Sequence, residues 1–130
     1  MIVLDASAAV DWLLQTPAGR QIERRIFLRN DSLYAPHLLD LEIGQVLRRL
    51  ARESLVTAQR ASEAIQDLLD LRIMRYPHFV LLGRIWQLRH NLSAYDAAYI
   101  ALAEELEAPL ITRDARLASA SGHAARVELF

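Results

Sequence analysis

The chain opens with four apolar residues followed directly by an acid, Met1-Ile2-Val3-Leu4-Asp5. The run is too short for a helix, and β-branched Ile2 and Val3 favour a strand. A short apolar run without polar interruption is typical of a strand buried on both faces of a parallel α/β sheet. Because such sheets bind ligands beyond the carboxyl ends of their strands, Asp5 is the first candidate for a functional residue.

Short apolar runs and amphipathic segments alternate along the rest of the chain, which predicts an α/β fold with a parallel sheet and helices on both faces. Further strands are predicted at 32–35, 73–76, 109–112 and 127–130. Helices are predicted at 7–14, 17–30, 38–52, 58–70, 79–90, 94–107 and 115–121, with Ser7, Thr16, Thr57 and Ser93 as N-caps and Asn91 as a terminator. No repeat or long linker divides the 130 residues, so we expect one domain over residues 1–130.

The composition, 53% hydrophobic and 24% charged, is that of a globular protein. No apolar run approaches the ~20 residues that span a bilayer, and no signal peptide is apparent. The absence of cysteine excludes disulfides and thiolate zinc sites and agrees with the cytoplasmic location that we expect. Because the net charge is −1, a nucleic-acid ligand would need a local basic patch or a bound cation.

Three acids lie at predicted element ends. Asp5 and Asp114 each follow an apolar strand, and parallel strands would bring both to the same edge of the sheet. Each is also a possible helix N-cap. Asp96 follows Ser93 by three residues, which fits a capping box, but a carboxylate in a first helical turn also points out of the helix N-terminus. The capping and functional roles are compatible for Asp96, and two strands that each end in an acid are harder to explain as two caps alone.

Glu42 borders the apolar stripe of the helix predicted at 38–52, beside Leu39 and Ile43, so it departs from the solvated position usual for a glutamate. The other acids we interpret as ordinary solvated charges: Asp11, Asp40, Asp67, Asp70, Glu104, Glu105 and Glu107. The four histidines have no zinc-like spacing and are interpreted as surface or structural residues: His37, His78, His90 and His123.

The order of four segments resembles the PIN-domain ribonucleases. These segments are Ile-Val-Leu-Asp-Ala-Ser at 2–7, Leu-Glu at 41–42, Ala-Tyr-Asp-Ala-Ala-Tyr at 94–99 and Leu-Ile-Thr-Arg-Asp at 110–114. Each is weakly specific, whereas their joint order and spacing is fairly specific and covers essentially the whole chain. The small size makes the chain similar to the VapC toxins of bacterial toxin–antitoxin pairs.

The resemblance implies a PIN-like three-layer α/β/α fold with strand order 3-2-1-4-5 and endoribonuclease activity that depends on Mg²⁺, with Mn²⁺ as a substitute. It implies a homodimer and inhibition by a small VapB-type antitoxin. Its metal-site acids would be Asp5, Glu42, Asp96 and Asp114, with Ser7 and Thr112 as supporting hydroxyls. The family commonly has asparagine three residues after the glutamate, where this chain has Gln45.

The chemistry of phosphodiester hydrolysis suits such a set of acids. Divalent metals activate water, neutralise the phosphate and help the leaving oxygen, and Mg²⁺ prefers oxygen ligands. Two carboxylates ~4 Å apart repel by roughly 4 kcal/mol at an effective dielectric of 20, which a cation would relieve. Arginines near these acids are candidate phosphate contacts, with solvated surface or ion pairs as the alternative: Arg113, Arg116, Arg48, Arg49 and Arg52.

Two alternatives remain open. A small metal-dependent phosphatase usually needs an acid two residues after the first strand's nucleophilic aspartate, and Ser7 at that position disfavours it. A non-catalytic binding module with the same fold is the other. Four apolar residues could line partner interfaces, although core packing is the favoured interpretation for each: Trp12, Leu13, Leu14 and Trp86.

Overall fold

A parallel sheet of five strands forms the centre of the computed structural model, which describes all of residues 1–130. The strand order is β3-β2-β1-β4-β5, and every neighbouring pair is parallel. The strands are β1 (Ile2–Leu4), β2 (Leu33–Pro36), β3 (Ile73–Tyr76), β4 (Leu110–Thr112) and β5 (Val127–Leu129). The α/β fold class and the strand order 3-2-1-4-5 are therefore confirmed.

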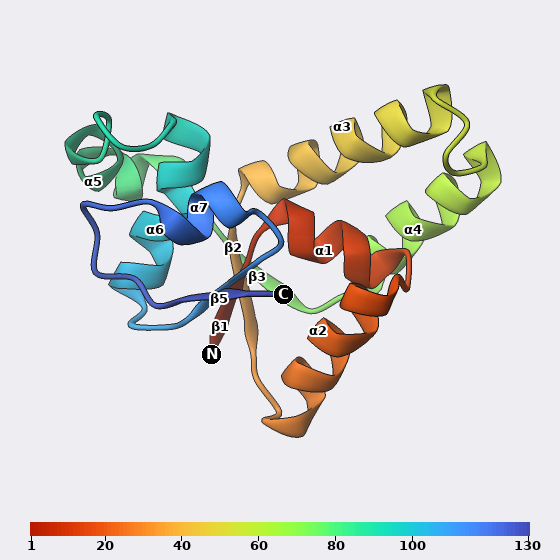
Figure 1. Cartoon of the computed structure of the whole chain (residues 1–130), viewed down its shortest axis with the longest axis horizontal. Coiled ribbons are helices and arrows are strands. Elements are labelled where there is room, and N and C mark those ends of the chain that lie inside the picture. Colours follow the sequence, from red (N-terminus) through yellow and green to blue (C-terminus); the bar gives the residue numbers. More distant parts are fainter.

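Seven helices and one 3₁₀ turn connect the strands. They are α1 (Ala6–Leu13), α2 (Pro17–Leu28), α3 (Leu38–Arg52), α4 (Ala58–Asp70), the turn η1 (His78–Leu81), α5 (Leu82–Gln87), α6 (Ala94–Glu105) and α7 (Ala115–Ser119). Figure 1 shows α1 to α4 on one side of the sheet and α5 to α7 on the other. This arrangement is the expected one, because crossovers between parallel strands are right-handed and the chain reverses direction across the sheet after β3.

The apolar run that opens the chain forms the central strand β1. Ile2, Val3 and Leu4 are each 0% exposed, as expected for a strand covered on both faces. They belong to one cluster of 34 buried residues that includes side chains from both helical layers. The core thus fixes the carboxyl end of β1, where Asp5 follows.

Apolar packing is confirmed for Trp12 and Leu13, which are buried, and for Leu14, which packs partly buried against the core. It is wrong for Trp86, whose side chain is 66% exposed on α5. The Arg89 guanidinium lies 4.5 Å from the centre of the Trp86 ring, a cation–π contact that keeps this aromatic face at the surface.

Several predicted element ends need correction. The N-cap of α1 is Asp5 and not Ser7, because the Asp5 carboxylate accepts the Ala8 N–H. The helix predicted at 79–90 is a 3₁₀ turn followed by α5, and α5 ends at Gln87 before the proposed terminator Asn91. In contrast, α3 begins and ends at the predicted residues. No helix in the structure combines the length and apolar character that crossing a membrane requires.

Candidate functional site

The four acids singled out from the sequence line one cleft at the carboxyl edge of the sheet. Asp5 follows β1, Asp114 follows β4, Asp96 lies in the first turn of α6, and Glu42 lies in α3. The cleft has a volume of about 290 Å³ and is lined by Asp5, Ala6, Ser7, Glu42, Gln45, Val46, Asp96, Tyr99 and Asp114. Tertiary packing therefore gathers residues that are separated by up to 109 positions in the sequence.

Asp5 is held by three hydrogen-bond donors at the end of β1. Its Oδ1 accepts bonds from Ser7 Oγ at 2.7 Å and from Ala8 N at 3.0 Å, and its Oδ2 accepts one from Thr112 Oγ1 at 2.6 Å. The residue is 5% exposed. Asp5 is thus both a helix cap and a cleft residue, which makes the two interpretations of its sequence position compatible.

Ser7 and Thr112 join the ends of β1 and β4. The Thr112 hydroxyl, which donates to Asp5, also accepts the Asp114 N–H at 2.9 Å. The Ser7 hydroxyl accepts the Arg113 N–H at 2.9 Å and lies 3.3 Å from the Thr112 hydroxyl. These two hydroxyls therefore set the position of Asp5 relative to the turn that carries Asp114.

Asp96 and Asp114 both lie at helix starts, where the backbone N–H groups favour negative charge. Ser93 is the N-cap of α6, and its hydroxyl accepts the Asp96 N–H at 3.1 Å. Asp114 is the N-cap of α7, and its Oδ1 accepts the Arg116 N–H at 2.9 Å. The capping interpretation holds for Asp114, and its carboxylate still lines the cleft.

Glu42 is held by a residue that sequence reasoning did not single out. The Tyr99 hydroxyl donates to Glu42 Oε1 at 2.6 Å, and the tyrosine is only 2% exposed. Burial and the negative charge of Glu42 raise the pKa of Tyr99, so the phenol keeps its proton. The available sequence signal was its spacing, because residues three apart lie on the same helix face and Tyr99 follows Asp96 by three.

The acids raise one another's pKa values. Burial raises the pKa of Asp5, Glu42 and Asp96. Neighbouring negative charge raises these pKa values further. The charge of Asp114 raises the pKa of Asp5 and Asp96, and the charges of Asp5 and Asp96 raise the pKa of Glu42. No basic group lies within 4 Å of any of the four carboxylates, since every ion pair in the structure joins other residues. The four carboxylates form no ion pair, so the cleft is a negatively charged site that would attract a cation.

The donor set suits a hard divalent ion. The acidic side chains that line the cleft are four carboxylates and the phenol of Tyr99, and Mg²⁺ is bound in proteins by one or two carboxylates while it keeps several waters. No three acidic or histidine side chains lie close enough to one another to enclose an ion directly. Asp5 and Glu42 instead face hydroxyl and N–H donors. The cleft is therefore better suited to an ion that keeps some of its waters than to an ion enclosed by protein ligands alone.

Two of the candidate phosphate-binding arginines are occupied by ion pairs. Arg113 Nε donates to Asp11 Oδ2 at 2.8 Å, and its guanidinium also bonds to the Phe130 carbonyl. Arg49 lies 3.8 Å from Glu53 one helical turn away. Arg113 thus ties the C-terminus to the turn after β4, and Asp11 is an ion-pair partner rather than the free solvated charge predicted.

Arg116 remains the arginine best placed to meet a substrate. It is exposed and makes no ion pair, and its backbone N–H donates to the carboxylate of Asp114, which lines the cleft. Its positive charge acts to lower the pKa of Asp96. Arg48 and Arg52 are also exposed and unpaired, but they lie further along α3.

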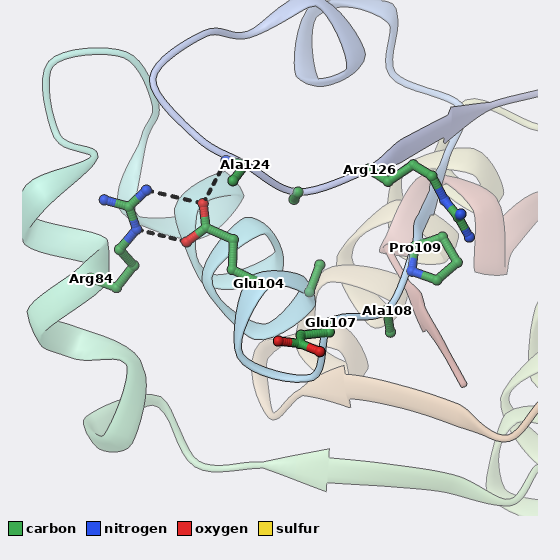
Figure 2. Close-up of a pocket in the computed structure, with 9 residues that line it drawn as sticks. Arg84, Glu104, Glu107, Ala108, Pro109, Ala124 and Arg126 are labelled. Carbon is green, nitrogen blue, oxygen red and sulfur yellow. Dashed lines mark hydrogen bonds and ion pairs between the residues drawn. The ribbon is translucent and has the colours of Figure 1, made fainter.

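A larger hollow of about 490 Å³ lies away from these acids, between α6, α5 and the segment that precedes β5 (Figure 2). Arg84 forms a two-pronged ion pair with Glu104, at 2.7 and 3.0 Å, and the Ala124 N–H donates to the same carboxylate at 2.9 Å. Arg84 lowers the pKa of Glu104, which is therefore not the free solvated charge predicted. This pairing attaches the C-terminal segment to α6.

Comparison with known proteins agrees with the observed fold. The PIN domain profile matches residues 2–122. The chain belongs to the PIN domain family. It is 46% identical over 117 residues to the VapC ribonuclease Mb0985 of Mycobacterium bovis, a match that covers 90% of this chain and 88% of that protein.

Solved structures of other proteins share the architecture at low sequence identity. PAE2754 from Pyrobaculum aerophilum superposes with a TM-score of 0.70 at 24% identity, covering 97% of this chain and 81% of that one. VapBC2 from Rickettsia felis, solved bound to a DNA fragment from its promoter, gives a TM-score of 0.64 at 14% identity, covering 99% of this chain and 98% of that one. At these low identities, the comparison shows a shared fold and nothing more.

Proposed function

We propose that this PIN domain is a Mg²⁺-dependent endoribonuclease and the toxin of a VapBC-type toxin–antitoxin pair, acting as a single domain over residues 1–130. The observation that carries the proposal is the convergence of Asp5, Glu42, Asp96 and Asp114 on one cleft with no basic partner. The reaction, cleavage of RNA, is proposed from the similarity of this chain to a protein named as a VapC ribonuclease.

In the proposed mechanism, Asp5, Glu42, Asp96 and Asp114 would hold the metal directly or through waters. When bound, Mg²⁺ supplies an activated water and neutralises charge on the scissile phosphate. Ser7 and Thr112 fix the Asp5 carboxylate, so that it is already oriented when substrate enters. Gln45 also lines the cleft, and its amide is available to a water or a phosphate oxygen.

The electrostatics of the cleft predict a metal effect that grows with pH. Acids with raised folded-state pKa values stabilise the fold below their ordinary pKa and lose that contribution as pH rises through the folded value. Metal relieves the repulsion only where the acids are ionised. We expect millimolar Mg²⁺ to add roughly 1–3 kcal/mol to the unfolding free energy at about pH 7.5 and much less at about pH 5.

Thermal unfolding with Mg²⁺ or EDTA at both pH values measures this effect, and an RNA cleavage assay under the same conditions tests activity. If the protein is folded and its melting temperature does not change when Mg²⁺ is added, the proposed metal site is wrong. Metal binding without turnover would favour the non-catalytic binding module, and hydrolysis of phosphomonoesters in place of RNA would favour the phosphatase.

We propose that Arg116 contacts an RNA phosphate. Arg116→Ala should weaken RNA affinity several-fold. It should also reduce the slope of log affinity against log salt concentration by the amount that corresponds to about one phosphate contact. Arg113→Ala is the matched control, since its guanidinium is bound to Asp11 and Phe130 and its loss should mainly lower the melting temperature. Fluorescence anisotropy with a single-stranded RNA across a salt series separates the two. Equal affinity losses in both variants would remove the specific role of Arg116.

We also propose a VapB-type antitoxin partner and a homodimer. The solved VapBC2 complex, which shares this fold, supports the first. Exposed apolar side chains on η1, α5 and the start of α6 support the second, and they are Phe79, Val80, Leu82, Trp86 and Tyr95. Light scattering of the purified chain should give twice the mass of one chain, and a Trp86→Glu variant that leaves that mass unchanged would exclude this surface from the dimer.

A further inference from the structure

Tyr99 connects the buried core to the cleft. Its ring is among the largest fully buried side chains of the protein, while its oxygen reaches Glu42 Oε1 at 2.6 Å. The two residues are 57 positions apart, one on α6 and one on α3. A carboxylate bond of this length is a strong, charge-assisted hydrogen bond. A rigid, buried group therefore holds a side chain of the cleft.

The Glu42 carboxylate is held by fewer hydrogen-bond donors than those of Asp5 and Asp114. Asp5 accepts bonds from three donors, and Asp114 accepts bonds from the N–H groups of Arg116 and Leu117. Glu42 accepts one, from Tyr99, and lies inside a helix where no backbone N–H is free for its carboxylate. Its side chain also has more rotatable bonds than an aspartate has, so more freedom is lost when it is fixed.

We propose that Tyr99 is a positioning residue for the cation site: by bonding to Oε1 it holds Glu42 in the cleft with Oε2 free of protein donors. This inference rests on the proposed function, because it presumes that Glu42 serves a divalent ion. The competing explanation is that Glu42 merely satisfies a buried tyrosine hydroxyl, as buried tyrosines require. The two explanations differ in whether the effect of Tyr99 passes through Glu42.

A double-mutant cycle on Mn²⁺ binding tests the proposal, with calorimetric titration of wild type, Tyr99→Phe, Glu42→Gln and the double variant. Loss of groups that orient metal ligands weakens metal affinity by about 10–100-fold, and we expect Tyr99→Phe to fall in that range. In the Glu42→Gln background, Tyr99→Phe should change the affinity by less than about twofold, since its target is already altered. Equal losses in both backgrounds would overturn the positioning role.

Tyr76→Phe on β3 is the matched control, because it removes a hydroxyl that does not line the cleft and should leave the Mn²⁺ affinity at the wild-type value. Circular dichroism of the metal-free variants confirms that each is folded. Wild-type protein that binds no Mn²⁺ would refute the proposed function and the role of Tyr99 with it. Wild-type binding that Tyr99→Phe leaves unchanged would refute only the role of Tyr99.

Discussion

Asp5→Asn should reduce RNA cleavage by at least about a hundredfold without unfolding the protein. Changes beside a metal ligand typically cost 10–100-fold, and loss of a ligand charge should cost at least as much. The substitution removes one negative charge from the centre of the acid cluster while keeping the shape of the side chain. Both the charge that attracts the cation and the oriented oxygen that would hold it are affected.

The hydrogen bonds around Asp5 explain why the fold should survive this change. An asparagine Oδ1 can still accept the Ala8 N–H and the Ser7 hydroxyl, so the cap of α1 remains. Its amide group would face the Thr112 oxygen, whose own proton can turn toward the Ser7 hydroxyl 3.3 Å away. Since burial and Asp114 raise the pKa of Asp5, the neutral residue should also relieve repulsion in the metal-free protein.

Cleavage of a single-stranded RNA, measured with thermal unfolding in EDTA and in Mg²⁺, checks this prediction. The metal-free melting temperature should equal or exceed that of wild type, and the shift caused by Mg²⁺ should shrink. Asp70→Asn, an exposed acid at the end of α4, is the control and should leave both quantities unchanged. Full activity in Asp5→Asn would remove Asp5 from the mechanism.

The largest expected effect on stability comes from Gly19→Ala in α2. A Cβ at this position would lie 1.9 Å from the Asp11 carbonyl oxygen, which is backbone of the adjoining helix α1. Overpacking typically costs 1–3 kcal/mol, and a contact this short with backbone should reach or exceed about 3 kcal/mol. For a chain of this size that is a fall of about 10 °C or more in melting temperature.

Gly44→Ala in α3 is the matched control. A Cβ there meets nothing within 4 Å, and alanine is favoured over glycine inside a helix by up to about 1 kcal/mol. Thermal unfolding should therefore show opposite signs for the same substitution at the two glycines. A Gly19→Ala protein as stable as wild type would mean that α1 and α2 separate easily, contrary to their close approach in the structure.

Local patterns determined most of the architecture. The buried strand at 2–4 follows from a short unbroken apolar run, and the helix at 38–52 follows from a side-chain period of 3.6 residues. Both patterns depend only on near neighbours. The placement of Asp5 and Asp114 at one sheet edge follows from the same logic, because parallel strands end together. The order 3-2-1-4-5 was implied by resemblance, since periodicity leaves strand order open.

Tertiary contacts decided which polar groups meet. Arg113 resembles a free phosphate ligand in the sequence, yet its partners Asp11 and Phe130 come from distant elements. The sequence pattern does not distinguish Tyr99 from the buried residues of its helix, and its role depends on its hydroxyl on α6 reaching Glu42 on α3. Burial and neighbouring charge are properties of the packed chain. The sequence by itself determined which acids are available and which elements carry them, whereas their shared cleft and its supporting hydrogen bonds arise only when both helical layers close on the sheet.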